Sequence, residues 1–247
     1  MNTKTLTVGI LAAIAGLIGG FLVANSLNRT EINLLKGQVE QKKTATSDSK
    51  PAPNEFTIDD DEIKAKIAQA DGSPDNFGFQ KNLGSALYRY ATMKKDAALV
   101  DEAKRILIRA NTLDPKDYDV LVDLGNAYFD TGYFKKDAAS FKLARETYER
   151  AFQAKPADAD VRTDFALTFF LDDPPDLAKA VAEFQKAIQF NPKQERALQY
   201  LTATYMRQGN FADAEKAVLQ LKAANPKNDA IADLETQIAK KEAPSVK

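Results

Sequence analysis

The chain has 247 residues, of which 44% are hydrophobic, and its 34 basic and 35 acidic side chains leave a formal net charge of −1. This length suffices for one or two domains, and the charge balance argues against a general nucleic-acid-binding protein. The sequence has no cysteine and no histidine, which excludes thiol nucleophiles, disulfides, cysteine or imidazole metal ligands and the commonest general base. We therefore expect no enzymatic activity and no cofactor.

The amino terminus is an uncharged apolar stretch. No charged residue lies between Lys4 and Arg29, and the apolar core from Leu6 to Leu27 has about the 20 residues that a helix needs to cross a bilayer. We expect residues 1–28 to form a single membrane-spanning anchor. A cleaved signal peptide, with a cleavage site at residues 24–26, is the alternative.

Four small residues recur at every fourth position of this stretch: Ala12, Gly16, Gly20 and Ala24. Such a stripe lets two membrane helices approach closely, so a homodimer through this helix is one hypothesis. The ordinary abundance of glycine and alanine in membrane helices is the other. Basic residues after the span favour a cytoplasmic carboxy-terminal side, whereas the short leading tail is typical of a signal anchor. We expect the remaining chain to lie outside the cytoplasm, in a periplasm, and the cytoplasmic side stays open.

Residues 29–56 are predicted to connect this anchor to the rest of the chain. Ile32, Leu35 and Val39 lie on one face of a predicted juxtamembrane helix over 31–41. The following stretch has almost no large apolar residue, so it cannot bury a core and is typical of a flexible tether. A first short helix is then predicted over 57–70, where Thr57 and Asp60 resemble a capping pair.

Beyond the tether, a short sequence motif that ends in proline recurs. Pro115, Pro156, Pro192 and Pro226 each close an amphipathic stretch. By subtraction of their numbers, successive prolines are 41, 36 and 34 residues apart. A period in this range indicates stacked units that bury their apolar faces against one another.

Small and large residues recur at matching positions within these units. Gly84, Gly125 and Ala166 are predicted to lie where two helices nearly touch. Proline ends the second helix of each unit because the residue before it avoids helical geometry. The apolar and small positions are Leu83, Leu87, Ala103, Leu107 and Ala110; Leu121, Leu124, Tyr128, Gly132, Ala144, Tyr148 and Ala151; Phe165, Phe169, Ala180, Phe184 and Ala187; and Leu198, Leu201, Tyr205, Gly209, Ala214, Val218 and Leu221.

In these residues the chain resembles the tetratricopeptide repeat family, whose unit is a helix–turn–helix of 34 residues. The resemblance implies an all-α fold: a right-handed superhelix of about four helical hairpins, with flanking helices at both ends. The domain is expected over 57–247, with repeats over about 75–115, 116–156, 157–192 and 193–226 and a closing helix over 228–241 that Asn228 caps.

The first two units each exceed the family length by seven residues. Seven residues make almost two helical turns, so they lengthen a helix without rotating its apolar face. We expect long second helices over 97–112 and 136–154 that project past the neighbouring units. In the third unit, the extra residues fall in a predicted turn over 172–175. The two aspartates of this turn could be paired catalytic carboxylates, but we favour a role in the turn, because they have no obvious pocket or partner.

In this family the first helices line a concave groove that commonly holds a peptide or a partner helix. By position, the groove residues here are Lys81, Asn82, Ser85, Asp119, Val122, Asp123, Asn126, Asp160, Thr163, Asp164, Leu167, Arg196, Gln199 and Ala203. One branch of the family grips a carboxy-terminal carboxylate with basic residues on its third unit, where this chain has Thr163 and Leu167. The acidic middle of the groove favours a neutral or basic peptide instead; a solvated acidic face is an equal alternative. The aromatic residues Tyr88, Tyr90, Tyr133, Phe134 and Phe141 are predicted to pack between helices.

The sequence thus predicts a membrane-anchored scaffold that binds a protein or peptide, and no nucleic acid. Anchored bacterial repeat proteins of this kind resemble the interaction modules of cytochrome c maturation and envelope assembly. The alternative is a homo-oligomeric structural membrane protein, organised through its transmembrane helix and its long repeat helices.

Overall fold

The computed structural model describes residues 59–242. The chain divides into two units, Met1–Asp60 and Asp61–Lys247, and nearly all described residues belong to the second. The predicted membrane span with its small-residue stripe, the juxtamembrane helix, the tether and Thr57 lie outside the described residues. Among residues 59–242, no helix combines the length and the apolar character that crossing a bilayer requires.

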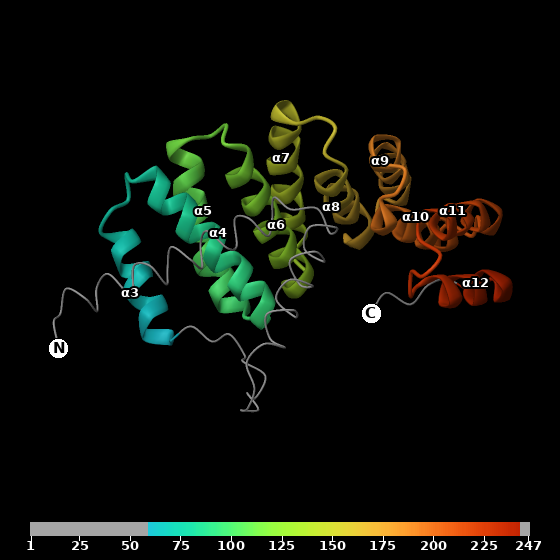
Figure 1. Cartoon of the computed structure of the whole chain (residues 1–247), viewed down its shortest axis with the longest axis horizontal. Helices are drawn as coiled ribbons and strands as arrows, with labels where there is room; N and C mark the ends of the chain where they lie inside the picture. Colours follow the sequence, from blue (N-terminus) through green and yellow to red (C-terminus); the bar gives the residue numbers. More distant parts are fainter. Residues whose placement is uncertain (1–58, 243–247) are drawn as a thin grey trace, which may run out of the picture. The chain divides into compact units, whose positions relative to one another are not determined.

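Residues 59–242 form ten helices and no strand (Figure 1), which confirms the all-α prediction. Eight of them pair as the hairpins α4–α5, α6–α7, α8–α9 and α10–α11, with α3 before the first hairpin and α12 after the last. The helices are α3 (Asp60–Asp71), α4 (Phe77–Lys94), α5 (Ala97–Leu113), α6 (Tyr118–Lys135), α7 (Ala138–Ala154), α8 (Ala159–Leu171), α9 (Leu177–Phe190), α10 (Glu195–Arg207), α11 (Phe211–Ala224) and α12 (Ile231–Lys240).

Local chemistry fixes where these helices begin and end. Each recurring proline directly follows the last-turn cap of a second helix, and that cap residue has a non-helical backbone, for example Asp114 with φ −133° and ψ 94°, as the residue before a proline prefers. At the opposite ends, an aspartate or asparagine accepts a hydrogen bond from a backbone N–H of the first turn, which stabilises a helix by about 1 kcal/mol. The capping residues are Asn76, Asp96, Asp117, Asp137, Asp158, Asp176 and Asn210.

The extra length of the first two units lies in both arms of each hairpin. Helices α4 and α6 have 18 residues, whereas α8 and α10 have 13; α5 and α7 have 17, whereas α9 and α11 have 14. The predicted long second helices are confirmed, and the first helices, for which no lengthening was predicted, are longer as well. An added turn on one arm of an antiparallel pair is buried only where the other arm extends beside it, so both arms grow together.

Within a hairpin the two helices touch where the first helix has no side chain. A Cβ atom added to Gly125 would lie 2.5 Å from Cε1 of Tyr148, and one added to Gly84 would lie 2.9 Å from the side chain of Leu107. Gly132, inside the lengthened α6, meets the ring of Phe141 in the same way. The prediction of close helix contact at Gly84 and Gly125 is confirmed.

The core runs from hairpin to hairpin along the stack. Tyr148, Phe170 and Phe184 are fully buried in one cluster that joins the second, third and fourth hairpins. At the far end, Ile231, Leu234 and Ile238 of α12 pack on the last hairpin. Helix α12 begins later than predicted.

Asn228 does not cap α12 but lies in the turn before it. Its amide donates to Glu195 over 2.8 Å and its carbonyl oxygen accepts from the Ala230 N–H. The residue at the start of α12, Ala230, makes no side-chain cap bond. The turn therefore holds α12 against the base of α10.

The first helices lie on the inside of the stack. Helices α4, α6, α8 and α10 each contact the next first helix, α4 with α6, α6 with α8 and α8 with α10, and α10 also contacts α12. In the described part of the chain, no comparable contact joins one second helix to the next. Because the inner arc of a curved stack is the shorter one, the first helices line its concave side.

The close contact at Gly125 gives a stability prediction. Gly125→Ala places a methyl group against the buried Tyr148 ring, and overpacking of this kind costs about 1–3 kcal/mol. Urea denaturation of the full chain should show this loss of unfolding free energy.

Gly78→Ala is the matched control, because Gly78 also lies in a first helix but a Cβ there would meet nothing nearer than 3.8 Å. This change should stabilise by about 0.5–1 kcal/mol, since alanine loses less backbone entropy than glycine. Equal effects at the two positions would contradict the proposed contact.

Candidate partner-binding groove

Polar side chains on the inward faces of the first helices join neighbouring hairpins. The Lys81 ammonium on α4 donates to Asp117 at 2.8 Å and to Asp119 at 2.9 Å, both at the start of α6. Lys81 and Asp117 are mostly buried, whereas the Asp119 side chain is 65% exposed. Of these three, Asp119 therefore keeps a surface that a ligand can reach.

Asp123 occupies the middle of α6 and is only 7% exposed. Ser85 of α4 hydrogen-bonds its carboxylate, which lowers its pKa, but burial has the larger effect and raises the pKa above its ordinary value. The oxygen Oδ2 accepts no hydrogen bond, and the Arg89 guanidinium lies 3.9 Å from it. A buried carboxylate oxygen with so loose a partner is electrostatically unsatisfied.

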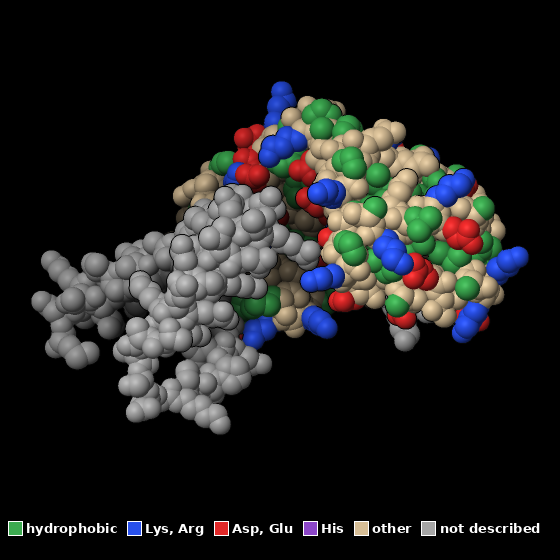
Figure 2. Space-filling model, turned by 45° about the vertical axis from the view of Figure 1, so that its right-hand side comes forward, with side chains coloured by type: hydrophobic (Ala, Val, Ile, Leu, Met, Phe, Trp, Pro, Cys, Tyr) green, Lys and Arg blue, Asp and Glu red, His purple; other side chains and the backbone are tan. Residues whose placement is uncertain are grey.

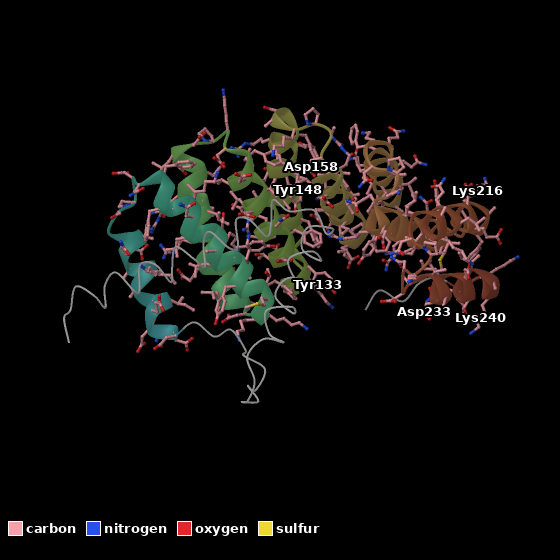
Figure 3. The ribbon with its side chains drawn as sticks, viewed as in Figure 1. Tyr133, Tyr148, Asp158, Lys216, Asp233 and Lys240 are labelled. Carbon is pink, nitrogen blue, oxygen red and sulfur yellow. The ribbon has the colours of Figure 1, made fainter. Side chains whose placement is uncertain are left out.

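About two turns further along α6, Asp130 adds another acidic group to the same face. It accepts a hydrogen bond of 2.8 Å from the Tyr88 hydroxyl of α4, and burial raises its pKa. Asn126, between the two aspartates, accepts from the Tyr148 hydroxyl at 2.7 Å; Tyr148 is labelled in Figure 3. Asp130, Tyr88 and Arg89 were not among the predicted groove residues, although Asp130 lies four residues after Asn126 and so shares its helix face.

Two further contacts join the third and fourth hairpins. The Arg196 guanidinium of α10 donates to Asp164 of α8, and Gln194 donates to Asp160 over 2.5 Å. The Asp164 side chain is 19% exposed, and burial raises its pKa to about 6 even though Arg196 and its hydrogen bond act in the opposite direction. Asp164 is therefore the groove residue that changes charge nearest to neutral pH.

The remaining predicted groove residues divide into reachable and buried positions. Asn82 is exposed, and Val122 and Gln199 are partly exposed. Thr163, Leu167 and Ala203 are 0%, 2% and 8% exposed, so the prediction that they face a ligand was wrong. Their side chains pack between helices. Each first helix has one face toward the groove and another in the core, and these residues belong to the core face.

Acidic groups outnumber basic ones along this face. Five aspartates (Asp119, Asp123, Asp130, Asp160 and Asp164) face three basic side chains (Lys81, Arg89 and Arg196). On the face that Figure 2 shows, described acidic and basic side chains are interspersed with apolar ones. Among residues 59–242 no cluster of three carboxylates is arranged to hold a metal ion. The inward face of the first helices therefore carries more acidic than basic groups.

Asp172, in the predicted turn over 172–175, has a structural role. Asp172 pairs with Arg145 of α7 at 2.9 Å, so this carboxylate links the second hairpin to the third.

Residues 176–238 match the model of the tetratricopeptide repeat family. Three similar solved structures are a MamA RS-1 ArsTM double mutant (TM-score 0.56, 18% identity, covering 69% of this chain and 86% of that chain), YrrB (0.56, 16%, 71% and 84%) and PilF of Pseudomonas aeruginosa (0.54, 17%, 67% and 70%). YrrB is described as a tetratricopeptide repeat protein with an unusual peptide-binding site. A comparison with curated proteins finds no match. The chain thus has the fold of tetratricopeptide repeat proteins.

The raised pKa of Asp164 predicts how stability depends on pH. The folded state favours the neutral acid, so Asp164 contributes to the free energy of unfolding. This contribution is fully present below the unfolded pKa of 3.8 and is lost as pH rises through about 6. Asp164→Asn mimics the neutral acid at every pH. At about pH 3.5 the variant and the parent chain should be similarly stable, because Asp164 is then protonated in both the folded and the unfolded parent, and at about pH 7.5 the variant should be the more stable by about 1–3 kcal/mol.

Urea titrations of both full-length proteins at the two pH values measure this difference. A difference that does not grow between them would show that Asp164 does not titrate in this range.

Proposed function

We propose that this chain is a protein-interaction scaffold whose concave groove binds a partner segment carrying a basic side chain. The observation that carries the proposal is the excess of acidic groups on this face: Asp119 is 65% exposed, and Asp130 and Asp164, whose pKa values burial raises, lie on the neighbouring first helices α6 and α8. A cation placed beside such groups offsets the cost of their desolvated charge.

The raised pKa values of these aspartates support a basic ligand specifically. Burial raises the pKa of Asp123, Asp130 and Asp164 because each charged form is poorly solvated. A neighbouring cation favours the charged form and lowers the pKa again. Ligand binding and proton release are therefore coupled, and the affinity of the groove for a basic side chain rises with pH until the aspartates are ionised.

The fold supports a binding role by analogy. Stacked helical hairpins supply an extended concave surface on which a segment of another protein can lie. A similar structure, YrrB, is described as having a peptide-binding site. Fold likeness alone does not fix a ligand, so the choice of a basic segment rests on the groove aspartates.

We further propose that the amino-terminal span predicted at Leu6–Leu27 anchors this scaffold to a membrane, with the repeats on the extracytoplasmic side. There it would assist the assembly or maturation of an envelope protein complex. The support for this part is the sequence: the length of the apolar run and the tether that follows it.

The groove proposal predicts charge-selective peptide binding. A fluorescent peptide of alternating arginine and alanine should bind the full chain, and the same peptide with neutral citrulline in place of arginine should bind at least about tenfold more weakly, as expected for loss of a charge-assisted contact. Asp130→Asn, which keeps a hydrogen-bond acceptor for Tyr88, should weaken arginine-peptide binding by a similar factor. Binding should also weaken as pH falls through about 6, where Asp164 becomes protonated. Fluorescence anisotropy measures all three effects.

Asp233→Asn is the matched control, because Asp233 is an exposed aspartate on α12 (Figure 3), on the far side of the last hairpin. It should bind the arginine peptide as the parent chain does. Equal binding of the two peptides, or equal losses for both variants, would rule out recognition by the groove.

The anchoring proposal makes a separate prediction. After alkaline extraction of cell membranes, the full chain should stay in the membrane pellet, since a spanning helix resists extraction whereas peripheral proteins are released. Recovery of the chain in the soluble fraction would overturn the anchor and leave the groove proposal standing.

A further inference from the structure

The turns of the two lengthened hairpins carry the same short sequence. The first reads Met93-Lys94-Lys95-Asp96-Ala97 and the second reads Phe134-Lys135-Lys136-Asp137-Ala138. Each consists of a large apolar residue at the end of a first helix, two lysines, the capping aspartate and the start of the second helix. We call residues 93–97 and 133–138 the hairpin tips.

The apolar residues of the hairpin tips are exposed. Met93 is 59% exposed, Phe134 57% and Tyr133 41%, so the prediction that Tyr133 and Phe134 pack between helices was wrong. Both lie in the last turn of α6, where their rings contact each other edge to face with centroids 5.4 Å apart. Figure 3 shows Tyr133 at the end of α6 remote from the α7–α8 connection.

The two hairpin tips lie next to each other. A hollow of about 340 Å³ is lined by Lys95, Asp96 and Ala97 of the first hairpin and by Asp130 and Phe134 of the second, among other residues. The Lys135 ammonium reaches Asp101 of the first hairpin over 2.7 Å. The turn of the first hairpin and the exposed Phe134 ring of the second therefore belong to one surface.

Among the described residues, unpaired lysines flank this surface, although Asp96 and Asp130 also line the hollow. Lys95 and Lys136 are exposed and adopt left-handed backbone conformations with φ 56° and 51°, and neither makes an ion pair with another described residue. The two acidic residues of the tips are occupied: Asp96 accepts from the Leu99 N–H and Asp137 from the Ala139 and Ser140 N–H groups. The hairpin tips carry four lysines and two aspartates, a net charge of +2.

The other two hairpins lack this combination. Their turns contain Asp172-Asp173-Pro174-Pro175 and Gln208-Gly209-Asn210, with neither a lysine nor a large exposed apolar residue. A helix dipole accounts for lysines at the ends of α4 and α6, but it does not account for three large apolar side chains left in water. The feature belongs to the two hairpins that are longer by five residues in the first helix, about 7.5 Å at 1.5 Å per residue.

We propose that the hairpin tips dock on the surface of an anionic lipid bilayer. Exposed aromatic and aliphatic side chains insert at the boundary between headgroups and acyl chains, where aromatic rings are favoured. The flanking lysines contact anionic headgroups, and each basic residue near such a surface strengthens the attraction. A protein partner of acidic surface is the competing occupant; the pairing of exposed aromatic rings with lysines on projecting turns favours the bilayer.

This contact adjoins the groove at one residue, Asp130, which also lines the hollow between the tips. The hairpin tips lie at the turn ends of the first two hairpins, whereas the groove runs along the inward faces of the first helices. Docking through the tips would therefore hold the groove near a membrane surface and leave its positions on α8 and α10 open. The proposal rests on described residues and does not require the predicted span.

The test uses the absence of tryptophan from the whole sequence. Phe134→Trp puts a single fluorescent reporter on the hairpin tips, and Leu219→Trp puts one at a 60% exposed position of α11 as the matched control. The full-length variants are incorporated into phosphatidylcholine vesicles with or without about 30% phosphatidylserine, a composition that gives a negative surface potential. Because both variants carry the same amino terminus, any anchoring through it is identical.

The Phe134→Trp emission should shift to the blue on the anionic vesicles only, and lipids with a quencher in the upper acyl chain should reduce it. The Leu219→Trp emission should change in neither case. Adding Lys95→Gln and Lys136→Gln to Phe134→Trp should abolish the shift. Met93→Trp provides a second reporter, so that a folding defect in one variant does not decide the result.

An identical Phe134→Trp spectrum on both kinds of vesicle, or an equal shift for Leu219→Trp, would overturn the proposal. So would a blue shift that depends on protein concentration in the absence of phosphatidylserine, because it would assign the hairpin tips to a contact between proteins.

Discussion

The close approach of the two helices in each hairpin determines the arrangement of the rest. Gly125 leaves no room for a Cβ atom beside the Tyr148 ring, and Gly84 leaves none beside Leu107. These contacts set the distance between the helices of a hairpin, and the buried aromatic cluster then sets how the second, third and fourth hairpins stack. The first helices come to lie on the inner side, where they contact one another. The groove is a consequence of this packing.

The inward residues have two roles that compete. Lys81 and Arg196 join neighbouring hairpins through aspartates, and those same aspartates form the acidic face that a ligand would meet. Burial makes the carboxyl groups of these aspartates costly to ionise, as the raised pKa values of Asp123 and Asp164 indicate. A ligand cation beside these aspartates would offset this cost, so its binding would also stabilise the contacts between neighbouring hairpins to which the aspartates belong.

Much of this architecture follows from the sequence. The prolines and the small residues predicted four hairpins because both act within a single hairpin: a proline ends its second helix, and a glycine in its first helix permits close contact with the second. The long second helices were predicted correctly from the extra residues, whereas the lengthening of the first helices was not predicted, because it depends on both arms burying each other. The family pattern placed Asp123 and Asp164 on the groove but also placed Leu167 there, which is buried. It missed Asp130, which lies four residues after Asn126 on the same face of α6. Pairs such as Tyr88 and Asp130 join different hairpins, so only the folded chain reveals them.

The central claim is that the inward faces of the first helices contact a protein partner. Site-specific photo-crosslinking in the cells that produce the full chain tests it most directly, with a photoreactive amino acid at Gln199 on the groove face of α10 or at Gln189, an exposed position of α9. The account predicts a discrete crosslinked protein from Gln199 that disappears when Asp130 is changed to asparagine, and none from Gln189. Crosslinks from Gln189 alone, or the same products from both positions, would contradict it.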